Sequence, residues 1–397
     1  MAFIVGVMLI DSIGFGITLP VTPQLIMTVG NVELAEAGLL SGYLFLVYAC
    51  VQFFSSPILG NLGDKYGRRP ILLCSLFTLS VAYLIPVFTT SLEWLFISRF
   101  VAGCGSATYL CAYAYIVDIT PIEQRAQRFG LAGAAFGAGL VVGPVIGGVL
   151  GAWDTRAPFA VASTLCMANF CYGFIVLKES LSLNARRDFN LKEMNPIGAM
   201  LRIGKYPAMV GMTLAYFLFV IAPFALSSYW TFFVIEKFKW SEIEVGFSQG
   251  FHGLMLVIIQ GLIYRWVVPT LGPSKAVILG MVAALIAYIC YAFAEYGWQL
   301  YLIIAVTGIS GFVLPSLQLI MTGQVPADSQ GELQGALSSL NSLASIVGPV
   351  VVMQLFFYFT NSGTVWYFPG ISFLAIALLT VLALFFFVRT IKLHQLN

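Results

Sequence analysis

The sequence predicts an all-α membrane protein with twelve transmembrane helices, arranged as two pseudo-symmetric six-helix bundles. Of its 397 residues, 60% are hydrophobic and only 9% are charged. Soluble proteins contain about 25% charged residues, so this composition excludes a water-soluble fold. The apolar residues form long runs, and landmark residues recur between the two halves. The net charge of +2 leaves no basic surface, so nucleic acid is not expected as a partner.

The apolar runs define the spans, because a helix needs roughly 20 apolar residues to cross a bilayer. The predicted spans are 2–24, 36–59, 70–90, 94–118, 127–151, 158–178, 207–234, 242–264, 275–294, 298–322, 332–357 and 366–389. The first run begins at Met1 without a basic region and carries Asp11, which favours a first span over a cleaved signal peptide. One long polar stretch interrupts the runs. We therefore expect an N-terminal bundle at 1–178, a linker at 179–206 and a C-terminal bundle at 207–397.

Lysine and arginine lie almost entirely in the loops of one side. That side carries Lys65, Arg68, Arg69, Arg125, Arg128, the linker cations, Arg265, Lys275, Arg389 and Lys392. The opposite loops hold only Arg156, Lys237 and Lys239. Because cytoplasmic loops are enriched in these residues, both termini and the linker are predicted to be cytoplasmic. We expect a plasma-membrane protein, in bacteria an inner-membrane protein.

An internal repeat appears when the chain is shifted by 205 positions. The shift aligns Gly67 with Gly272, Gly103 with Gly308, Pro121 with Pro326, Gly130 with Gly335, and Gly143-Pro144 with Gly348-Pro349. Duplicated six-helix halves are one design of secondary transporters, with the substrate site near the midplane between the halves. The charges do not repeat: Asp11 aligns with Tyr216 and Arg99 with Ile304. Ion coupling is therefore expected in the first half.

Asp11 is the only acid well inside a predicted span and Arg99 the only cation, and His252 is the only histidine in a span. A charge inside the bilayer costs about 2.5–3.5 kcal/mol, so such groups face a cavity or a partner. We interpret Asp11 as a proton-binding group, with Arg99 as a positive charge that tunes its protonation. His252 is a second candidate, because histidine titrates near neutral pH. The alternatives are a structural Asp11–Arg99 ion pair and a packing role for His252.

A glycine-rich charged loop follows the second span, from Gly60 to Pro70. Asp64 and Arg68 are four residues apart and can pair. Asp118 and Arg125 flank the turn after the fourth span. Surface pairing of this kind is usually worth under about 1 kcal/mol, so a plain cytoplasmic hairpin is the alternative interpretation.

The fifth span carries glycines at every fourth position, namely Gly139, Gly143, Gly147 and Gly151. This spacing places them on one helix face, where they allow a neighbouring helix to approach closely. Pro144 adds a kink. Tight packing without a further role is the alternative.

The sequence lacks the motifs of disulfide-rich proteins, metal sites and common enzymes. The seven cysteines lie in apolar runs without a CxxC pair, so neither a disulfide framework nor a metal site is expected. No Walker loop, HExxH or GxSxG motif occurs, so ATP hydrolysis and recognisable hydrolase chemistry are not supported. We expect no enzyme activity and no cofactor. A membrane enzyme or a transport-inactive receptor is the alternative from another class.

These motifs resemble the major facilitator superfamily, and within it the twelve-helix drug:proton antiporters. The matching stretches are Gly60-x-Leu62-x-Asp64-x-x-Gly67-Arg68-Arg69, the first-span stretch from Asp11 to Pro23, Ser98-Arg99-x-x-x-Gly103, and Gly139-x-x-x-Gly143-Pro144-x-x-Gly147-Gly148. The resemblance implies that the loop acts as a conformational latch, involving Gly60, Asp64, Gly67, Arg68, Arg69, Asp118 and Arg125. It also implies that the fifth span seals the pathway through Gly139, Gly143, Pro144, Gly147 and Gly148.

Within that branch the sequence is most similar to tetracycline exporters. Val51-Gln52-Phe53, the stretch from Tyr115 to Thr120, and that from Gln330 to Gly335 match this group. The chain departs from it at Ala82 and Ala284, where those exporters carry acids.

The sequence therefore predicts proton-coupled efflux of a hydrophobic drug-like compound, with tetracycline-like molecules as candidates, by a monomer in the bilayer. An uncoupled or uptake-type carrier of a small amphipathic or lipid-like solute is the alternative. Apolar and aromatic walls with a few polar anchors would bind the small-molecule substrate. The candidate anchors are the polar residues within spans: Gln52, Tyr113, Tyr229, Gln260, Gln318 and Asn341.

Overall fold

The computed structural model describes residues 2–182, 186, 207–326 and 330–394. Most of the predicted linker therefore lies outside the described residues. The described residues form α-helices joined by short turns, with no strand among them, which confirms the all-α class. Among the described residues, eleven helices are long and apolar enough to cross a membrane, and one bent pair brings the number to as many as twelve.

The chain divides into two compact units. Unit 1 comprises Met1–Met194 with Trp240–Gly253, and unit 2 comprises Asn195–Lys239 with Leu254–Asn397. Unit 1 contains α1 (Ala2–Thr18), α2 (Thr22–Gly30), α3 (Leu34–Tyr66), α4 (Arg68–Phe88), α5 (Leu92–Cys104), α6 (Thr108–Ile119), α7 (Ile122–Gly151), α8 (Ala157–Val176) and most of α11 (Glu242–Val257).

The first span is a bent pair rather than one straight helix. The sequence predicts a span at 2–24, whereas α1 ends at Thr18 and α2 continues from Thr22 to Gly30 after a bend of 51°. Pro20 lies in the break and Pro23 in the first turn of α2. Proline cannot donate a backbone hydrogen bond within a helix but is well tolerated in a first turn, which accounts for the break and for the restart.

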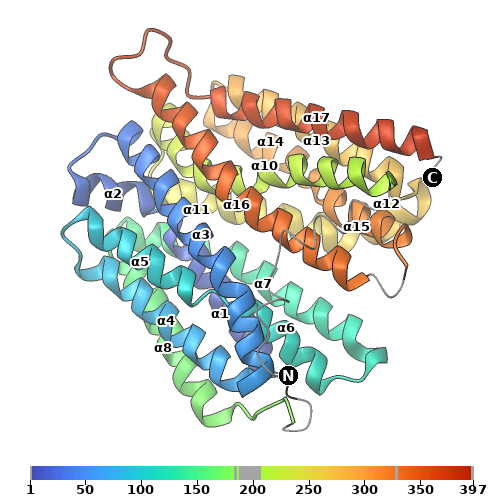
Figure 1. Cartoon of the computed structure of the whole chain (residues 1–397). Helices are drawn as coiled ribbons and strands as arrows, with labels where there is room; N and C mark the ends of the chain where they lie inside the picture. The colour runs from blue at the N-terminus through green and yellow to red at the C-terminus, as the bar shows by residue number, and fades with distance from the viewer. Residues whose placement is uncertain (1, 183–185, 187–206, 327–329, 395–397) are drawn as a thin grey trace. The chain divides into compact units, whose positions relative to one another are not determined.

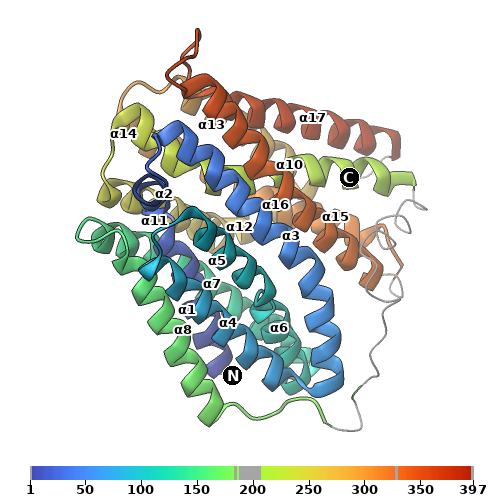
Figure 2. The same cartoon turned by 60° about the vertical axis from the view of Figure 1, so that its left-hand side comes forward.

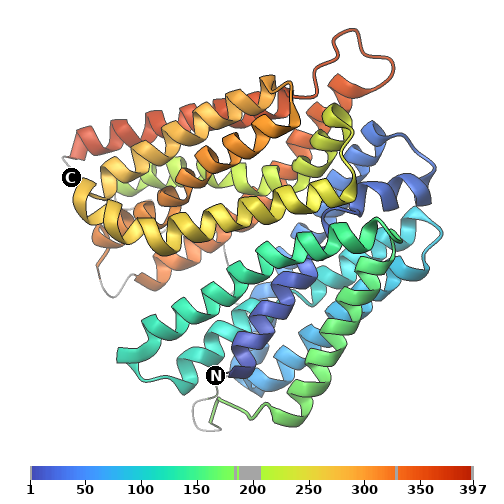
Figure 3. The ribbon, with the colours of Figure 1, turned by 180° about the vertical axis from the view of Figure 1, so that it is seen from behind.

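The core of unit 1 forms where α1 packs against α7 and α8 (Figure 3). A β-carbon added to Gly139 would lie 1.9 Å from the Ser12 hydroxyl oxygen, and one added to Gly147 would lie 2.1 Å from the Ile17 carbonyl oxygen. The predicted glycine face of the fifth span is thus in contact with α1. Around this contact α4 packs beside α8 and α5 (Figure 2).

Unit 2 contains α10 (Pro207–Phe238), the π-helical segment η3 (Ile258–Ile263), α12 (Tyr264–Leu271), α13 (Pro273–Phe293), α14 (Gly297–Gly308), the 3₁₀ segment η4 (Ile309–Phe312), α15 (Val313–Gly323), α16 (Gln330–Thr360) and α17 (Ile371–His394). Helix α10 packs against α16 and α17 (Figure 1). An aromatic core joins these three helices. The Tyr229 ring contacts those of Phe233, Phe356 and Phe373, and the Phe233 ring also contacts that of Phe373, at centroid distances of 4.7–5.7 Å.

The internal repeat extends to backbone geometry. Gly67 and Gly272 are the glycines with positive φ in the described chain, at 109° and 81°. Each separates two helices, and each donates its N–H to the carbonyl four residues earlier. Aligned residues therefore adopt the same rare conformation, which glycine adopts without the steric cost of a side chain.

A second pair of aligned residues makes the same hydrogen bonds. The Arg125 guanidinium donates to the carbonyls of Thr120 and Val117, both at 3.2 Å. Its repeat counterpart Gln330 donates to the carbonyls of Val325 and Thr322, both at 2.8 Å. In each unit this side chain satisfies carbonyl groups at the end of the preceding helix, α6 or α15, which have no intrahelical partner.

Candidate functional site

Two groups of polar residues in unit 1 are candidates for function. The first, here called the hairpin clamp, consists of Asp64, Arg68, Asp118, Glu179 and Ser180. It surrounds the turn at Gly67, which joins α3 to α4. A β-carbon added to Gly67 would lie 2.2 Å from a Glu179 carboxylate oxygen. Glycine is therefore required here both by φ and by the contact with Glu179.

Glu179 binds the beginning of α4. Its carboxylate accepts hydrogen bonds from the backbone N–H groups of Arg68, at 2.8 Å, and Arg69, at 3.2 Å. The first N–H groups of a helix have no intrahelical partner and carry partial positive charge, so a carboxylate is well suited to them. The sequence did not single out this residue, because its partners lie more than a hundred residues earlier in the chain. The available signal was an acid directly after the sixth span.

Asp118 connects the hairpin to α6. The Arg68 guanidinium forms an ion pair with Asp64, and its Nε lies 3.6 Å from Asp118 Oδ2. The Ser180 hydroxyl donates to the same Asp118 oxygen at 2.8 Å. The side chains of Arg68 and Asp118 are only 14% and 16% exposed, so water screens this pair less than an open surface pair. The clamp thus joins α3, α4, α6 and the segment after α8.

The other predicted latch residues make separate contacts. Arg69 donates to the Phe174 carbonyl at 2.8 Å, tying α4 to α8. Gly60 lies against α6, where an added β-carbon would be 2.9 Å from Leu110. Arg125 binds the carbonyls at the end of α6, and the described structure gives it no hydrogen bond to an acid of the clamp.

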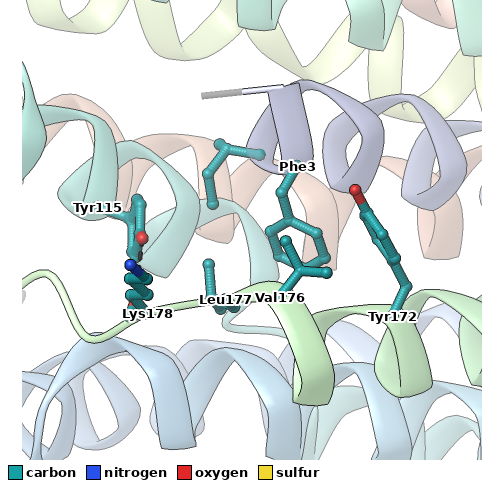
Figure 4. Close-up of a pocket in the computed structure, with 7 residues that line it drawn as sticks. Phe3, Tyr115, Tyr172, Val176, Leu177 and Lys178 are labelled. Carbon is teal, nitrogen blue, oxygen red and sulfur yellow. Dashed lines mark hydrogen bonds between the residues drawn. The ribbon is translucent and has the colours of Figure 1, made fainter.

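A cavity of about 290 Å³ adjoins the hairpin clamp. Its lining is mostly apolar and consists of Phe3, Ile4, Tyr115, Tyr172, Val176, Leu177 and Lys178. Figure 4 shows Phe3 and Tyr172 on one side of it and Tyr115 with Lys178 on the other. The Tyr115 hydroxyl donates to the Lys178 carbonyl at 2.9 Å. The beginning of α1 thus packs near the segment that carries Glu179.

The second group surrounds Asp11. Electrostatic interactions connect Asp11 and Arg99 with Tyr48 of α3 and Tyr83 of α4. Asp11, Tyr48 and Arg99 are half-buried, and Tyr83 is buried. Tyr48 also hydrogen-bonds with Gln52. Asp11 and Arg99 form no ion pair within 4.0 Å in the described structure. The two charged groups therefore interact with the same two tyrosines and do not contact each other directly.

His252 lies on α11 and is half-buried. The neighbouring Gly250 and Gly253 pack against α7, where added β-carbons would lie 2.6 Å from the Val145 side chain and 3.0 Å from the Val141 side chain. His252 forms no hydrogen bond or ion pair within the described part of the chain. The histidine thus belongs to the same compact unit as Asp11.

The predicted substrate anchors have different surroundings. Tyr113 packs against Phe129 with a ring-centroid distance of 5.5 Å. Gln260 is exposed and lies in η3 beside Gly311 of η4. Tyr229 is fully buried in the aromatic core and donates its hydroxyl to the Pro369 carbonyl. Gln318 and Asn341, by contrast, both reach the hydroxyl of Tyr216.

Two helical units repeated at an offset of 205 residues, with matching hairpin glycines and a carboxyl group within a span, define the class of secondary transporters. The comparison with protein families agrees with this class. The family model described as "Major Facilitator Superfamily" matches residues 4–349. The chain belongs to this superfamily.

Among curated proteins, the chain is similar to tetracycline resistance proteins. It is 35% identical to the class C protein of Escherichia coli over 353 residues, covering 89% of this chain and 88% of the relative. It is 30% identical to the class B protein of Escherichia coli, covering 94% and 92%. Among solved structures, the nucleoside transporter NupG has a TM-score of 0.80 at 13% identity, with 98% of each chain covered. The human organic anion transporter MFSD10 has a TM-score of 0.72 at 21% identity, with 97% of this chain and 98% of that chain covered.

Proposed function

We propose that this protein exports a hydrophobic drug-like compound, with tetracycline-like molecules as the leading candidates, in exchange for protons. The observation that carries the proposal is the position of the Asp11 carboxyl group within a span, where it interacts with the same tyrosines as Arg99. A group that binds a proton in one access state and releases it in the other couples transport to the proton gradient. The 35% identity to a tetracycline resistance protein supports the substrate class.

The mechanism proposed is alternating access, with Asp11 as the proton site and the two units as the moving parts. The excess of lysine and arginine in the loops of one side supports a cytoplasmic location for both termini and the linker. We propose that a monomer in the plasma membrane, the inner membrane in bacteria, carries a small molecule and protons, without enzymatic activity and without nucleic acid. The glycine contacts between α1 and α7 limit leakage by leaving no space between these helices.

The hairpin clamp serves as the latch of this cycle. Arg68 forms ion pairs with both Asp64 and Asp118, so the two pairs can form and break together. Gly60 and Gly67 permit the close contacts around them. Arg69 and Arg125 support the clamp by binding helix-end or neighbouring carbonyls. This arrangement allows a small charge rearrangement at the cytoplasmic turn to change how α3, α4, α6 and the segment after α8 are held together.

A substrate panel in proteoliposomes with an imposed proton gradient tests the proposal. Accumulation of tetracycline against its own gradient, abolished by a protonophore, is the expected result. Transport that reaches equal concentrations whatever the proton gradient would favour an uncoupled carrier. That second candidate has one observation in its favour. Ala82 and Ala284, where similar exporters carry acids, are 1% and 0% exposed and lie in packed cores.

A further inference from the structure

Unit 2 contains a cluster of neutral polar side chains within its spans, here called the Tyr216 site. It consists of Tyr216 on α10, Gln318 on α15 and Asn341 on α16. The Asn341 amide donates to the Tyr216 hydroxyl at 3.0 Å, and Gln318 also hydrogen-bonds with this hydroxyl. Three helices that are separate in sequence thus contribute one polar side chain each.

The amides of this site are only partly buried. Tyr216 is 2% exposed, whereas Gln318 and Asn341 are half-buried. An amide that faces hydrocarbon without a hydrogen-bond partner is strongly disfavoured, so the open part of each amide is expected to face a polar space. The rest of α16 agrees with this orientation. Its exposed and half-exposed side includes Gln334, Ser338, Asn341 and Ser345, while its buried side consists of Leu333, Ala336, Leu337, Leu340 and Ala344.

A further polar group beside the site lacks a partner. The Thr213 hydroxyl oxygen is buried and makes no hydrogen bond in the described structure. Thr213 precedes Tyr216 by three residues on α10, so both side chains lie on the same helix face. A buried polar atom without a partner is unusual in a native protein, and a ligand is one way to satisfy it.

The internal repeat relates the Tyr216 site to Asp11. Tyr216 stands in the second half where Asp11 stands in the first. The first copy therefore supplies a carboxyl group, and the second supplies a neutral hydroxyl with two amides. Each amide offers both donors and an acceptor, and the hydroxyl offers both as well.

We propose that the Tyr216 site binds the exported compound through neutral hydrogen bonds, and that it selects molecules with neighbouring keto, enol or phenol oxygens. This inference rests on the proposed export function and assigns the two tasks to different units. Protonation belongs to Asp11 in unit 1, and recognition of substrate oxygens belongs to unit 2. Glu236 and Arg265, two described charged residues of unit 2, lie at the end of α10 and the beginning of α12, respectively.

The test measures binding to purified protein in the absence of any gradient. Two probes are used: tetracycline, which carries keto, enol and phenol oxygens, and tetraphenylphosphonium, an apolar cation without them. The variants Tyr216→Phe and Asn341→Leu each remove one hydrogen-bonding group. Each is expected to raise the Kd of tetracycline about three- to tenfold, the usual effect of one hydrogen bond. The Kd of tetraphenylphosphonium is expected not to change.

Tyr291→Phe is the matched control, because Tyr291 is another buried tyrosine of unit 2 with a 3.0 Å hydrogen bond, from Thr307. It should leave both Kd values unchanged. Equal weakening of both probes in Tyr216→Phe would mean a structural pair and overturn the proposal, as would an unchanged Kd for tetracycline or a wild type that does not bind it.

Transport assays separate this inference from the export function. If the wild type binds tetracycline through Tyr216 but does not move it with a proton gradient, the site stands and proton-coupled export fails. If export is proton-driven while Tyr216→Phe and Asn341→Leu retain wild-type tetracycline affinity, the export function stands and the site fails.

Discussion

At the scale of single residues, Asp11 is the position on which coupling depends. Asp11→Asn keeps the shape of the side chain but cannot release a proton. It is expected to abolish gradient-driven accumulation in proteoliposomes while substrate still binds. Substrate-induced proton release from purified protein measures the same step directly. Glu33→Gln is the control, since Glu33 is an exposed acid at the beginning of α3. Normal proton release and uphill transport in Asp11→Asn would move the search to His252.

Glu179 provides a second test at this scale. Glu179→Gln retains hydrogen-bond acceptance but removes the charge, whereas Glu179→Ala removes both. Loss of a helix-capping group costs about 0.5–2 kcal/mol, so the alanine variant should unfold at lower temperature and transport more slowly, with the glutamine variant between it and the wild type. Thermal unfolding and initial transport rates measure the two effects. Identical behaviour of all three proteins would mean that Glu179 is an incidental surface contact.

Within the hairpin clamp, Asp64→Asn and Arg68→Ala are expected to lower the transport rate while leaving folded protein in the membrane. Arg125→Ala and Arg125→Gln form an informative pair. Because Gln330 makes the equivalent bonds in unit 2 with a neutral amide, glutamine at position 125 should preserve transport better than alanine. Normal rates in Asp64→Asn and Arg68→Ala would reduce the clamp to a topological anchor.

At the scale of helices, the α1–α7 contact depends on glycine. The β-carbon of Gly147→Ala would meet backbone atoms of Ile17, which cannot move aside as the end of a flexible side chain can. Overpacking of this kind costs about 1–3 kcal/mol. Gly133→Ala, on the same helix α7, meets nothing within 4 Å and is the matched control. We expect a lower unfolding temperature and increased proton leak for Gly147→Ala, and neither for Gly133→Ala. Equal stability of the two variants would contradict the packing argument.

The helices themselves were largely predictable, and their partners were not. Apolar runs locate spans because crossing the bilayer requires length and composition that are local properties of sequence. The predicted first span ran through Pro20 to residue 24, whereas α1 ends at Thr18 and α2 continues to Gly30 after a 51° bend. Glu179 and Tyr216 escaped prediction for a related reason. The partners of Glu179 are on α4 and those of Tyr216 on α15 and α16, distances along the chain that periodicity does not reveal.

At the scale of the whole chain, orientation follows from the distribution of lysine and arginine. In a variant without native cysteines, a cysteine at Trp153 or Val365, which are 88% and 93% exposed, should react with a membrane-impermeant maleimide added to intact cells. A cysteine at Lys392, also exposed, should react only after the membrane is opened. The reverse pattern would show that the positive-inside rule fails for this protein.

The two hairpin glycines have one further consequence, which concerns how freely each half can evolve. Both Gly67 and Gly272 have positive φ, but a β-carbon at Gly67 would collide with Glu179, whereas one at Gly272 would meet nothing within 4 Å. Backbone ψ is 159° at Gly67 and 154° at Gly272, and positive φ combined with such a ψ is essentially restricted to glycine. Under selection for transport, a randomised library should therefore recover only glycine at both positions. After duplication, backbone conformation alone would have kept the glycine in both copies of the turn, although only the first copy acquired a side-chain neighbour.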